Sequence, residues 1–241
     1  MDLKRLCSNV RKAIDDYNLI NENDKIAVGV SGGKDSIALL YALASIRKYY
    51  PKKFELYAIT VDLGFENFDV KNISKICSDL DVEHIIVNTQ IAKIVFEERK
   101  EENPCSLCAK LRKGALNDEL KTLNINKVAY AHHMDDVIET LMLSLIYEGR
   151  FQTICPKYTL DKTNITVIRP LIYVKEVDVI GFINKMNILI QPKSCPNDGK
   201  SKREYIKNLI RSINIDNPGV KKRMFTAILN SDLEGWNDGN N

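Results

Sequence analysis

The sequence predicts an α/β fold, a doubly wound parallel sheet with an N-terminal helix and a helical C-terminal extension. Short apolar runs alternate with amphipathic segments along the chain, and strands spaced by helices imply right-handed crossovers and a parallel sheet. A glycine pair follows the first apolar run directly, as happens where a strand turns into a helix around an anion. At 241 residues the chain is long enough to bury a sizeable core.

Hydrophobic periodicity and helix signals give the order of the elements. Strands are expected at 26–30, 54–61, 84–87, 128–131 and 167–171, and helices at 3–17, 36–49, 70–80, 91–100, 106–123, 135–147 and 174–185. The expected domains are an N-terminal helix over 1–21, the main α/β domain over 22–192, a basic helical extension over 193–233 and a frayed tail over 234–241.

Composition excludes several classes of protein. No apolar run approaches the length of a membrane span, and charges interrupt residues 1–19, which are therefore expected to form an amphipathic helix and not a signal peptide. We expect a cytoplasmic protein without a membrane partner. Six cysteines in such a chain suggest reactive or ligand thiols more than a disulfide framework.

The chain is organised around the segment from Lys25 to Ser36, KIAVGVSGGKDS. Its apolar half is typical of a strand buried on both faces, and its second half places the glycine pair before a helix that Asp35 or Ser36 can cap. Backbone amides and the positive end of the helix dipole would then converge on one anion. We interpret six residues as a phosphate-binding loop: Ser31, Gly32, Gly33, Lys34, Asp35 and Ser36. An ordinary glycine-rich turn is the alternative.

Ligands of a doubly wound sheet bind beyond the carboxyl ends of its strands. Four residues follow predicted strands and are expected to share one crevice: Gly32, Gly33, Asp62 and His132. Two adjacent carboxylates, Asp135 and Asp136, come directly after in the sequence AHHMDDVIET. Either one could simply cap the helix, but a pair of carboxylates aimed at the crevice is better explained by Mg²⁺ handling or proton transfer.

Cysteines and cations mark two further segments. Cys105 and Cys108 form a CxxC at the start of a basic helix that also carries Arg112, and the helix dipole and nearby cations lower the pKa of a thiol there. A redox dithiol, half of a zinc site and two unrelated thiols are all compatible with this motif alone. The run from Lys200 to Arg223 holds eight basic and two acidic residues, which fits a phosphate-backbone footprint, although a charge run is usually a solvated face.

Several segments together resemble one family. They are SGGKDS (31–36), CSLCAKLRKG (105–114), AHHMDDVIETLMLSLIYEGR (131–150), VIRPLIYVKEVDV (167–179), Cys195 in KSCP, and NPGVKKRMFTAI (217–228). The family is that of the iron–sulfur-dependent tRNA thiolation enzymes within the PP-loop ATP-pyrophosphatases, which split ATP into AMP and pyrophosphate. The resemblance runs from about residue 26 to 229 and implies the adenine-nucleotide alpha-hydrolase (PP-loop) type of fold.

The resemblance implies an ATP-dependent tRNA sulfurtransferase whose cofactors are ATP, Mg²⁺ and a 4Fe-4S cluster. The loop would hold the pyrophosphate, with Asp35 a candidate Mg²⁺ ligand, while the 2-carbonyl oxygen of a pyrimidine attacks the α-phosphorus and a sulfide then displaces AMP. The most similar members act on cytidine 32 of the anticodon loop and make 2-thiocytidine. The cluster would be held by three cysteines, Cys105, Cys108 and Cys195, which leaves one iron without a protein thiolate.

Other roles follow from the same resemblance. Asp62 and His132 would lie beside ATP, and Asp135 or Asp136 would position Mg²⁺ or move a proton. Arg112 would stabilise charge near the cluster. The implied partners are tRNA and a sulfur donor, either a cysteine desulfurase or free sulfide, and a homodimer is compatible with the resemblance.

Several alternatives stay open at this point. The 2-thiocytidine enzymes commonly carry a second CxxC where this chain has only Cys195, so another tRNA pyrimidine is an option, as is a small-molecule substrate. Lysidine synthetase shares SGGxDS and HHxDDxxET, but its amine nucleophile would leave the cysteines without a role. A nucleotide-binding module that senses redox state would bind ATP without releasing pyrophosphate. Zinc competes with the cluster, with His132 or His133 as a fourth ligand.

Overall fold

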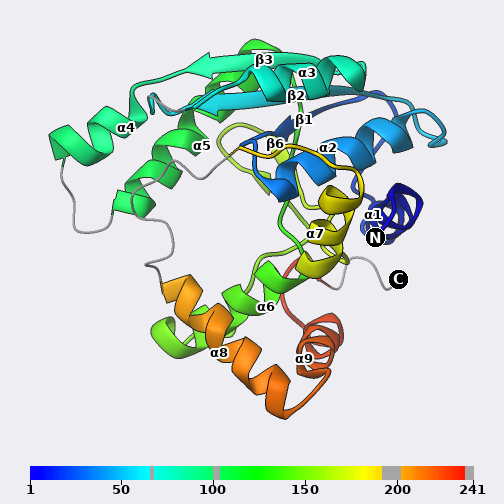
Figure 1. The fold of residues 1–241 in the computed structure, drawn as a ribbon, viewed down its shortest axis with the longest axis vertical. Coiled ribbons are helices and arrows are strands. Elements are labelled where there is room, and N and C mark those ends of the chain that lie inside the picture. Colours follow the sequence, from blue (N-terminus) through cyan, green and yellow to red (C-terminus); the bar gives the residue numbers. More distant parts are fainter. Residues whose placement is uncertain (66–67, 100–103, 192–201, 237–241) are drawn as a thin grey trace.

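A six-stranded sheet forms the centre of the computed structural model, which describes residues 1–65, 68–99, 104–191 and 202–236 (Figure 1). The strands are β1 (Asp24–Gly29), β2 (Phe54–Asp62), β3 (Glu83–Asn88), β4 (Lys127–Ala129), β5 (Lys157–Leu160) and β6 (Ile165–Ile168). They are ordered β3-β2-β1-β4-β6-β5, and every neighbouring pair is parallel except β5 and β6. The predicted parallel α/β sheet is confirmed, with an additional antiparallel edge strand, β5.

Helices pack on both faces of this sheet, as a doubly wound fold requires. They are α1 (Leu3–Asp16), α2 (Lys34–Arg47), α3 (Lys71–Asp79), α4 (Ile91–Lys93), α5 (Pro104–Thr122), α6 (Met134–Leu143), α7 (Glu176–Lys185), α8 (Lys202–Asp216) and α9 (Val220–Leu229), with π-helical turns η1 (Ile94–Arg99) and η2 (Ser144–Glu148). Among the described residues, no helix combines the length and the apolar character that crossing a membrane requires.

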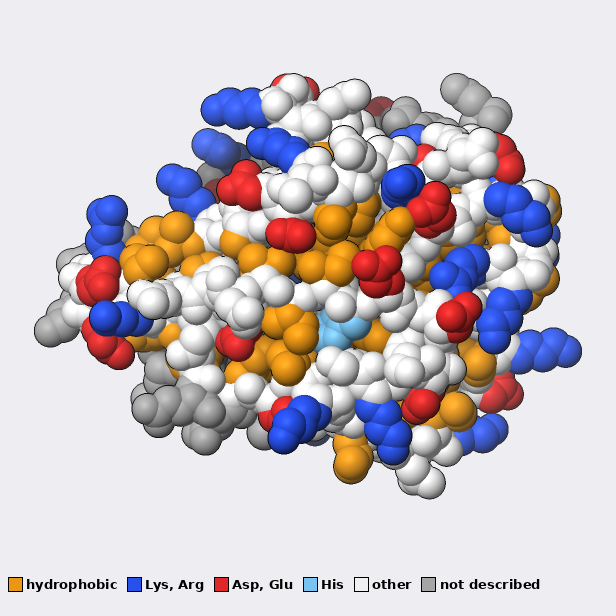
Figure 2. Space-filling view, turned by 90° about the horizontal axis from the view of Figure 1, so that it is seen from above, with side chains coloured by type: hydrophobic (Ala, Val, Ile, Leu, Met, Phe, Trp, Pro, Cys, Tyr) orange, Lys and Arg blue, Asp and Glu red, His pale blue; other side chains and the backbone are white. Residues whose placement is uncertain are grey.

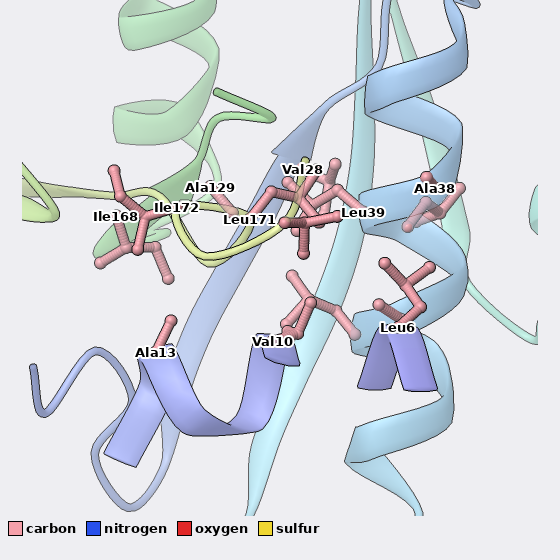
Figure 3. Packing of buried hydrophobic residues seen from close by; sticks show 14 of the residues in the cluster. Leu6, Val10, Ala13, Val28, Ala38, Leu39, Ala129, Ile168, Leu171 and Ile172 are labelled. Atoms are coloured by element: carbon pink, nitrogen blue, oxygen red, sulfur yellow. The ribbon is translucent and has the colours of Figure 1, made fainter. Parts of the chain in front are cut away.

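Strand β1 is buried on both faces, as its apolar run predicted. Ile26 and Val28 belong to the larger core cluster, to which α1, α2 and α7 also contribute, whereas Ala27 belongs to a smaller cluster on the side of α5. Successive side chains of a strand point to opposite faces, so one strand serves two cores. Figure 3 shows Val10 of α1 beneath Val28, and Leu6 of the same helix beneath Ala38 of α2.

The structure corrects the predicted cap of helix α2. The helix begins at Lys34, its N-cap is Gly33, and no side chain makes the cap hydrogen bond. Asp35 and Ser36, which were expected to cap, therefore lie inside the first turn. Because no side chain covers the helix start, its backbone N–H groups point toward the space beyond β1.

The tail expected to fray from Glu234 instead packs onto the protein as far as Trp236. The indole of Trp236 is only 1% exposed and makes edge contacts with the rings of Tyr17 and Phe225, at centroid distances of 6.1 and 5.8 Å. Helices α8 and α9 join the same core cluster through Ile206, Ile210, Phe225 and Ile228. The domain boundary expected at 192–193 lies outside the described residues.

Replacing Trp236 with Ala should lower the free energy of unfolding by about 3–5 kcal/mol, the usual cost of deleting a buried aromatic side chain. Trp236→Phe should cost less, because it keeps a ring and removes an indole N–H that has no acceptor among the described residues. Urea denaturation followed by far-ultraviolet circular dichroism measures both. Val177→Ala, at a side chain that is 67% exposed, is the control and should stay within about 0.5 kcal/mol. Wild-type stability in Trp236→Ala would support the frayed tail.

Candidate active site

The loop between β1 and α2 is held in shape by its own serines. The Ser36 hydroxyl donates to the Gly33 carbonyl at 3.0 Å and accepts from the Ser31 backbone N–H at 3.2 Å. The hydroxyls of Ser31 and Ser36 lie 3.3 Å apart. These contacts fold the loop back on the first turn of α2, so its backbone conformation is set before any ligand arrives.

Of the two glycines in the loop, Gly32 has the conformation that requires glycine. Its φ is +77°, and a Cβ there would lie 2.5 Å from Cγ of Gln191. Gln191 covers this point because its backbone N–H donates to the Gly32 carbonyl at 3.0 Å. Gly33 has an ordinary φ of −77°, and a Cβ on it would meet nothing closer than the Ser31 hydroxyl, at 3.5 Å.

A cleft of about 780 Å³ opens beyond the carboxyl ends of β1 and β4. Strand order reverses between these two strands, and such a switch point is where doubly wound sheets bind ligands. The lining includes loop residues Ser31, Gly33, Asp35 and Ser36, apolar side chains Ile59, Val61, Leu63, Phe65 and Phe68, and polar side chains Arg112, Lys113, His132, Asp136, Arg169 and Gln191.

The crevice predicted from the strand ends forms, but not with all four of its expected members. Gly33 and His132 line the cleft. Gly32 lies against Gln191, as described above, and is not among the described lining residues. Asp62 is not among them either, and its carboxylate accepts a hydrogen bond from the Gly64 backbone N–H at 2.8 Å. Gly32 and Asp62 are therefore not part of the described lining of the cleft.

His132 is held in its neutral form by its surroundings. Burial and the neighbouring Arg169 guanidinium lower the pKa of His132 to about 4, and its Nδ1 accepts a hydrogen bond from Arg169 Nε at 3.2 Å. Arg169 also donates to the Cys155 carbonyl and lies over the Tyr158 ring at 5.1 Å. Sequence reasoning did not single out Arg169, because it placed this residue inside the strand expected at 167–171, whereas β6 ends at Ile168 and Arg169 follows it.

The two adjacent carboxylates of α6 face different surroundings. Asp136 lines the cleft and forms a capping box, in which its carboxylate accepts from the His133 N–H at 2.9 Å and its own N–H donates to His133 Nδ1 at 3.3 Å. Asp135 is buried, bound to Lys221 Nζ at 2.7 Å and to the Glu176 N–H at 2.8 Å. The expectation that both aim at the crevice is wrong for Asp135, because successive helical residues point about 100° apart.

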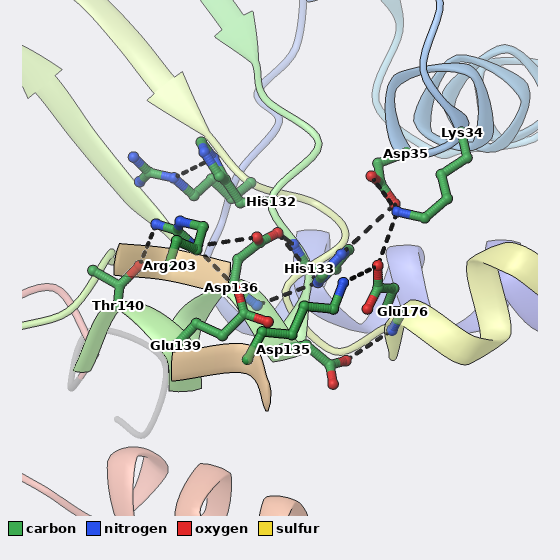
Figure 4. Close-up of polar contacts among 12 residues, drawn as sticks. Lys34, Asp35, His132, His133, Asp135, Asp136, Glu139, Thr140, Glu176 and Arg203 are labelled. Carbon is green, nitrogen blue, oxygen red and sulfur yellow. Dashed lines mark hydrogen bonds and ion pairs between the residues drawn. The ribbon is translucent and has the colours of Figure 1, made fainter. Parts of the chain in front are cut away.

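Some cations of the basic C-terminal run form ion pairs with acids of other helices, and Figure 4 shows Arg203 beside Asp136, Glu139 and Thr140. Arg203 Nη1 donates to Asp136 Oδ1 at 3.4 Å and to Glu139 Oε2 at 3.3 Å. Its Nη2 donates to the Thr140 hydroxyl at 3.1 Å. Lys207 binds Glu176 at 2.8 Å. These ion pairs fasten α8 to α6 and α7, and the expected phosphate footprint of the run stays a prediction. Among the described residues, four other cations of the run are exposed: Lys202, Arg211, Lys222 and Arg223.

The side chain of Glu176 joins the loop to α8. Its carboxylate binds Lys34 Nζ at 3.1 Å as well as Lys207 Nζ at 2.8 Å. Burial alone would disfavour the charge, but Lys207 and Lys34 outweigh burial and lower the pKa of Glu176 to about 2. Nearby, burial and the charge of Asp136 raise the pKa of Glu139. Glu176 was not among the predicted site residues, because its partners lie far from it in the sequence.

Helix α5 carries the CxxC motif in its first turn, directly before Ala109, the first residue of this helix that lines the cleft. Cys105 is exposed and Cys108 half-buried, and the spacing of Cys105, Cys108 and Arg112 places them on one face of the helix. Arg112 lines the cleft. Cys195 lies outside the described residues. Within the described ranges, no three His, Cys, Asp or Glu residues are grouped so that they could hold a metal ion.

These features place the chain among the α/β proteins that bind a ligand at the switch point of a doubly wound sheet. The model of the PP-loop domain family matches residues 3–213, and the chain belongs to that family.

The chain is also similar to curated proteins and to a solved structure. The chain is 38% identical over 229 residues to a tRNA-cytidine(32) 2-sulfurtransferase of Geotalea uraniireducens, covering 94% of this chain and 91% of that one. It is 36% identical over 230 residues to the protein of the same name from Geobacter sulfurreducens, at 94% and 90% coverage. The U34-tRNA thiolase NcsA from Methanococcus maripaludis, solved with its 4Fe-4S cluster, superposes with a TM-score of 0.75 at 26% identity, covering 93% of this chain and 76% of that one.

Alanine at the two loop glycines should have different effects. Gly32→Ala should destabilise the fold by roughly 1–2 kcal/mol or more, because of its left-handed φ and the clash with Gln191. Gly33→Ala should leave the melting temperature nearly unchanged, because its methyl meets no close neighbour, but that methyl occupies the phosphate side of the loop. Pyrophosphate release from ATP should then slow by roughly 100-fold. Thermal melts and a pyrophosphate assay separate the two effects, and wild-type release by Gly33→Ala would contradict the loop assignment.

Proposed function

We propose that this chain is an ATP-dependent tRNA sulfurtransferase. It adenylates the 2-carbonyl of a tRNA pyrimidine, cytidine 32 of the anticodon loop, and replaces that oxygen with sulfur to give 2-thiocytidine. The observation that carries the proposal is helix α5, which begins with Cys105 and Cys108 and contributes Arg112 to the cleft that the phosphate-binding loop also lines. The identity to tRNA-cytidine(32) 2-sulfurtransferases over 94% of the chain supports the choice of substrate.

In this proposal ATP lies along the cleft. Its pyrophosphate end meets the backbone N–H groups of the loop and the uncapped start of α2, where the helix dipole favours an anion. The adenine lies at the end of β2, where apolar side chains such as Ile59, Val61 and Phe65 line the cleft. The carboxylates of Asp35 and Asp136 both line it as well and are the kind of ligand that Mg²⁺ takes.

The reaction then has two displacements. The 2-carbonyl oxygen of the pyrimidine forms a bond to the α-phosphorus while the bond to the β-phosphate oxygen breaks, and pyrophosphate leaves on the loop. A sulfide next adds at C2, and the former carbonyl oxygen departs with AMP. Asp136 is the better candidate than Asp135 for moving a proton or holding Mg²⁺, because its carboxylate borders the cleft. Neutral His132 and the cationic Arg112 and Arg169 line the same space, so these cations can balance the phosphate charge.

Two described cysteines fit a 4Fe-4S cluster that takes its third thiolate from elsewhere. Cys105 and Cys108 stand one helical turn apart at the start of α5, whose residues Ala109 and Arg112 line the cleft, and Cys105 is exposed. Thiolates are the ligands that such clusters require. We propose Cys195 as the third ligand. When bound, a cluster held by three cysteines supplies one iron without a protein thiolate, at which sulfide from a cysteine desulfurase or from solution can bind.

Anaerobically purified protein should contain about four irons per chain, and tRNA from a deletion strain should lack 2-thiocytidine. Replacing Cys105, Cys108 or Cys195 with Ala should abolish iron retention and complementation, whereas Cys7→Ala, Cys77→Ala and Cys155→Ala should retain both. ATP binding should survive in all six variants, because the loop belongs to a separate element. Iron analysis, complementation and mass spectrometry of tRNA nucleosides provide the readouts.

Two outcomes would contradict the cluster. Stoichiometric zinc without iron in active protein would assign the cysteines to a structural metal site. Full thiolation by Cys105→Ala would remove the CxxC from the chemistry altogether. Loss of a different tRNA nucleoside in the deletion strain would keep the chemistry and change the target base.

Exposed cations of α8 and α9 should carry part of the tRNA contact. The face seen in Figure 2 intersperses charges of both signs, so it offers no reason to place the RNA there. Replacing Lys202, Arg211 and Lys222 together with Ala should weaken tRNA binding and reduce the dependence of log K on log salt by roughly 0.7 to 0.9 per lost phosphate contact. Filter binding at several salt concentrations measures this slope.

The matched control replaces Lys4, Lys71 and Lys75, three exposed cations on α1 and α3. It changes the net charge by the same amount and should leave the slope as in the wild type. If both triple variants change the salt dependence of tRNA binding equally, the C-terminal cations form only a solvated face and make no specific phosphate contact.

A further inference from the structure

Lys34 belongs to the phosphate-binding loop, but its ammonium group is held by carboxylates. Lys34 Nζ lies 2.8 and 3.1 Å from the two carboxylate oxygens of Asp35 and 3.1 Å from Glu176 Oε1. Lys34 is not among the described residues that line the cleft, whereas Asp35 on the next position is. Figure 4 shows the Lys34 side chain extended toward Glu176. The loop cation that could meet a phosphate is thus occupied by protein anions.

Glu176 is a fixed anchor for this ammonium group. It is the first residue of α7, and its backbone N–H donates to the buried carboxylate of Asp135 at 2.8 Å. Asp135 is itself bound to Lys221 of α9 at 2.7 Å. Lys34, in contrast, carries its charge on a flexible four-carbon stem. If a phosphate attracts the ammonium group, Lys34 is therefore the partner that moves.

We propose that Glu176 is a positioning residue for Lys34, which holds the ammonium group outside the cleft and competes for it with the phosphates of the bound nucleotide. The inference rests on the proposed function to the extent that the loop receives pyrophosphate. Its physical basis is that one ammonium group cannot be fully paired with Glu176 and with a phosphate in the cleft at the same time. Glu176 thereby weakens product binding, which favours release of pyrophosphate after the adenylation step.

Lys207 of α8 weakens the contact between Glu176 and Lys34. Its ammonium group binds the same oxygen, Glu176 Oε1, at 2.8 Å. Two cations that share one carboxylate repel each other, so each one loosens the hold of Glu176 on the other. Removing the Lys207 charge should tighten the contact between Glu176 and Lys34. The proposal therefore predicts opposite effects for substitutions at Glu176 and Lys207.

Isothermal titration of inorganic pyrophosphate into the full-length protein tests the proposal without tRNA or a cluster. Glu176→Gln should bind pyrophosphate roughly three- to fivefold more tightly than the wild type, the range that one partly buried ion pair contributes. Lys34→Met should bind it more weakly. In the Lys34→Met background the Glu176→Gln change should give no gain. Glu176→Asp, which keeps the charge, should stay closer to the wild type than Glu176→Gln.

The Lys207→Met variant should weaken pyrophosphate binding about twofold or more, and only while Glu176 is present, since its effect acts through that carboxylate. Asp118→Asn is the charge-matched control. It removes one negative charge from an exposed pair with Lys121 at 3.8 Å on α5 and should leave the affinity unchanged. Thermal melts of each variant confirm that the fold is intact.

Four results would contradict this inference. An unchanged or weaker affinity in Glu176→Gln overturns the inference. An equal gain in the Lys34→Met background does so as well, because the effect would then be general repulsion of the anion by Glu176. An equal gain in pyrophosphate affinity in Asp118→Asn would show that the effect comes from the net charge of the protein and not from Glu176. A wild-type protein that binds no pyrophosphate would overturn the nucleotide step of the proposed function, and this inference with it.

Discussion

The left-handed backbone at Gly32 is the constraint on which the site depends. It turns the chain out of β1 and directly into α2, and it leaves room for Gln191, whose backbone N–H binds the Gly32 carbonyl at 3.0 Å. Since no side chain caps α2, the amides of its first turn remain available to an anion. A fold with β1 buried on both faces keeps this turn rigid, because the strand before it cannot shift without disturbing two cores.

Helix α6 carries the second constraint, a set of acidic side chains that bind α7, α8 and α9 next to the cleft. Asp135 faces inward and binds α7 and α9, while Asp136 faces the cleft and caps its own helix. Arg203 reaches Asp136 and Glu139 from α8. The C-terminal helices α8 and α9 are therefore fastened by ion pairs to the same helix, α6, that presents a carboxylate to the cleft.

Sequence reasoning placed most elements well, and its errors have identifiable causes. The alternation of apolar runs and amphipathic helices was strong enough to indicate the parallel sheet, but the four-residue strand β5, Lys157–Leu160, is too short for its period to stand out. A tryptophan near the C-terminus gave no local sign of burial, because its partners Tyr17 and Phe225 come from distant segments. The charge run likewise did not reveal which cations meet acids from α6 and α7.

The sequence by itself determined the chemistry that this chain can offer: a glycine-containing loop after a buried strand, a CxxC at the start of a basic helix, and paired carboxylates after paired histidines. These are local patterns, and local backbone preferences are enough to specify them. Only the tertiary structure decided which of the adjacent carboxylates Asp135 and Asp136 borders the cleft, which cations are engaged internally, and that Glu176 shares its charge between Lys34 and Lys207. Such choices depend on contacts between residues far apart in the chain, whose partners are set by packing and not by spacing along the sequence.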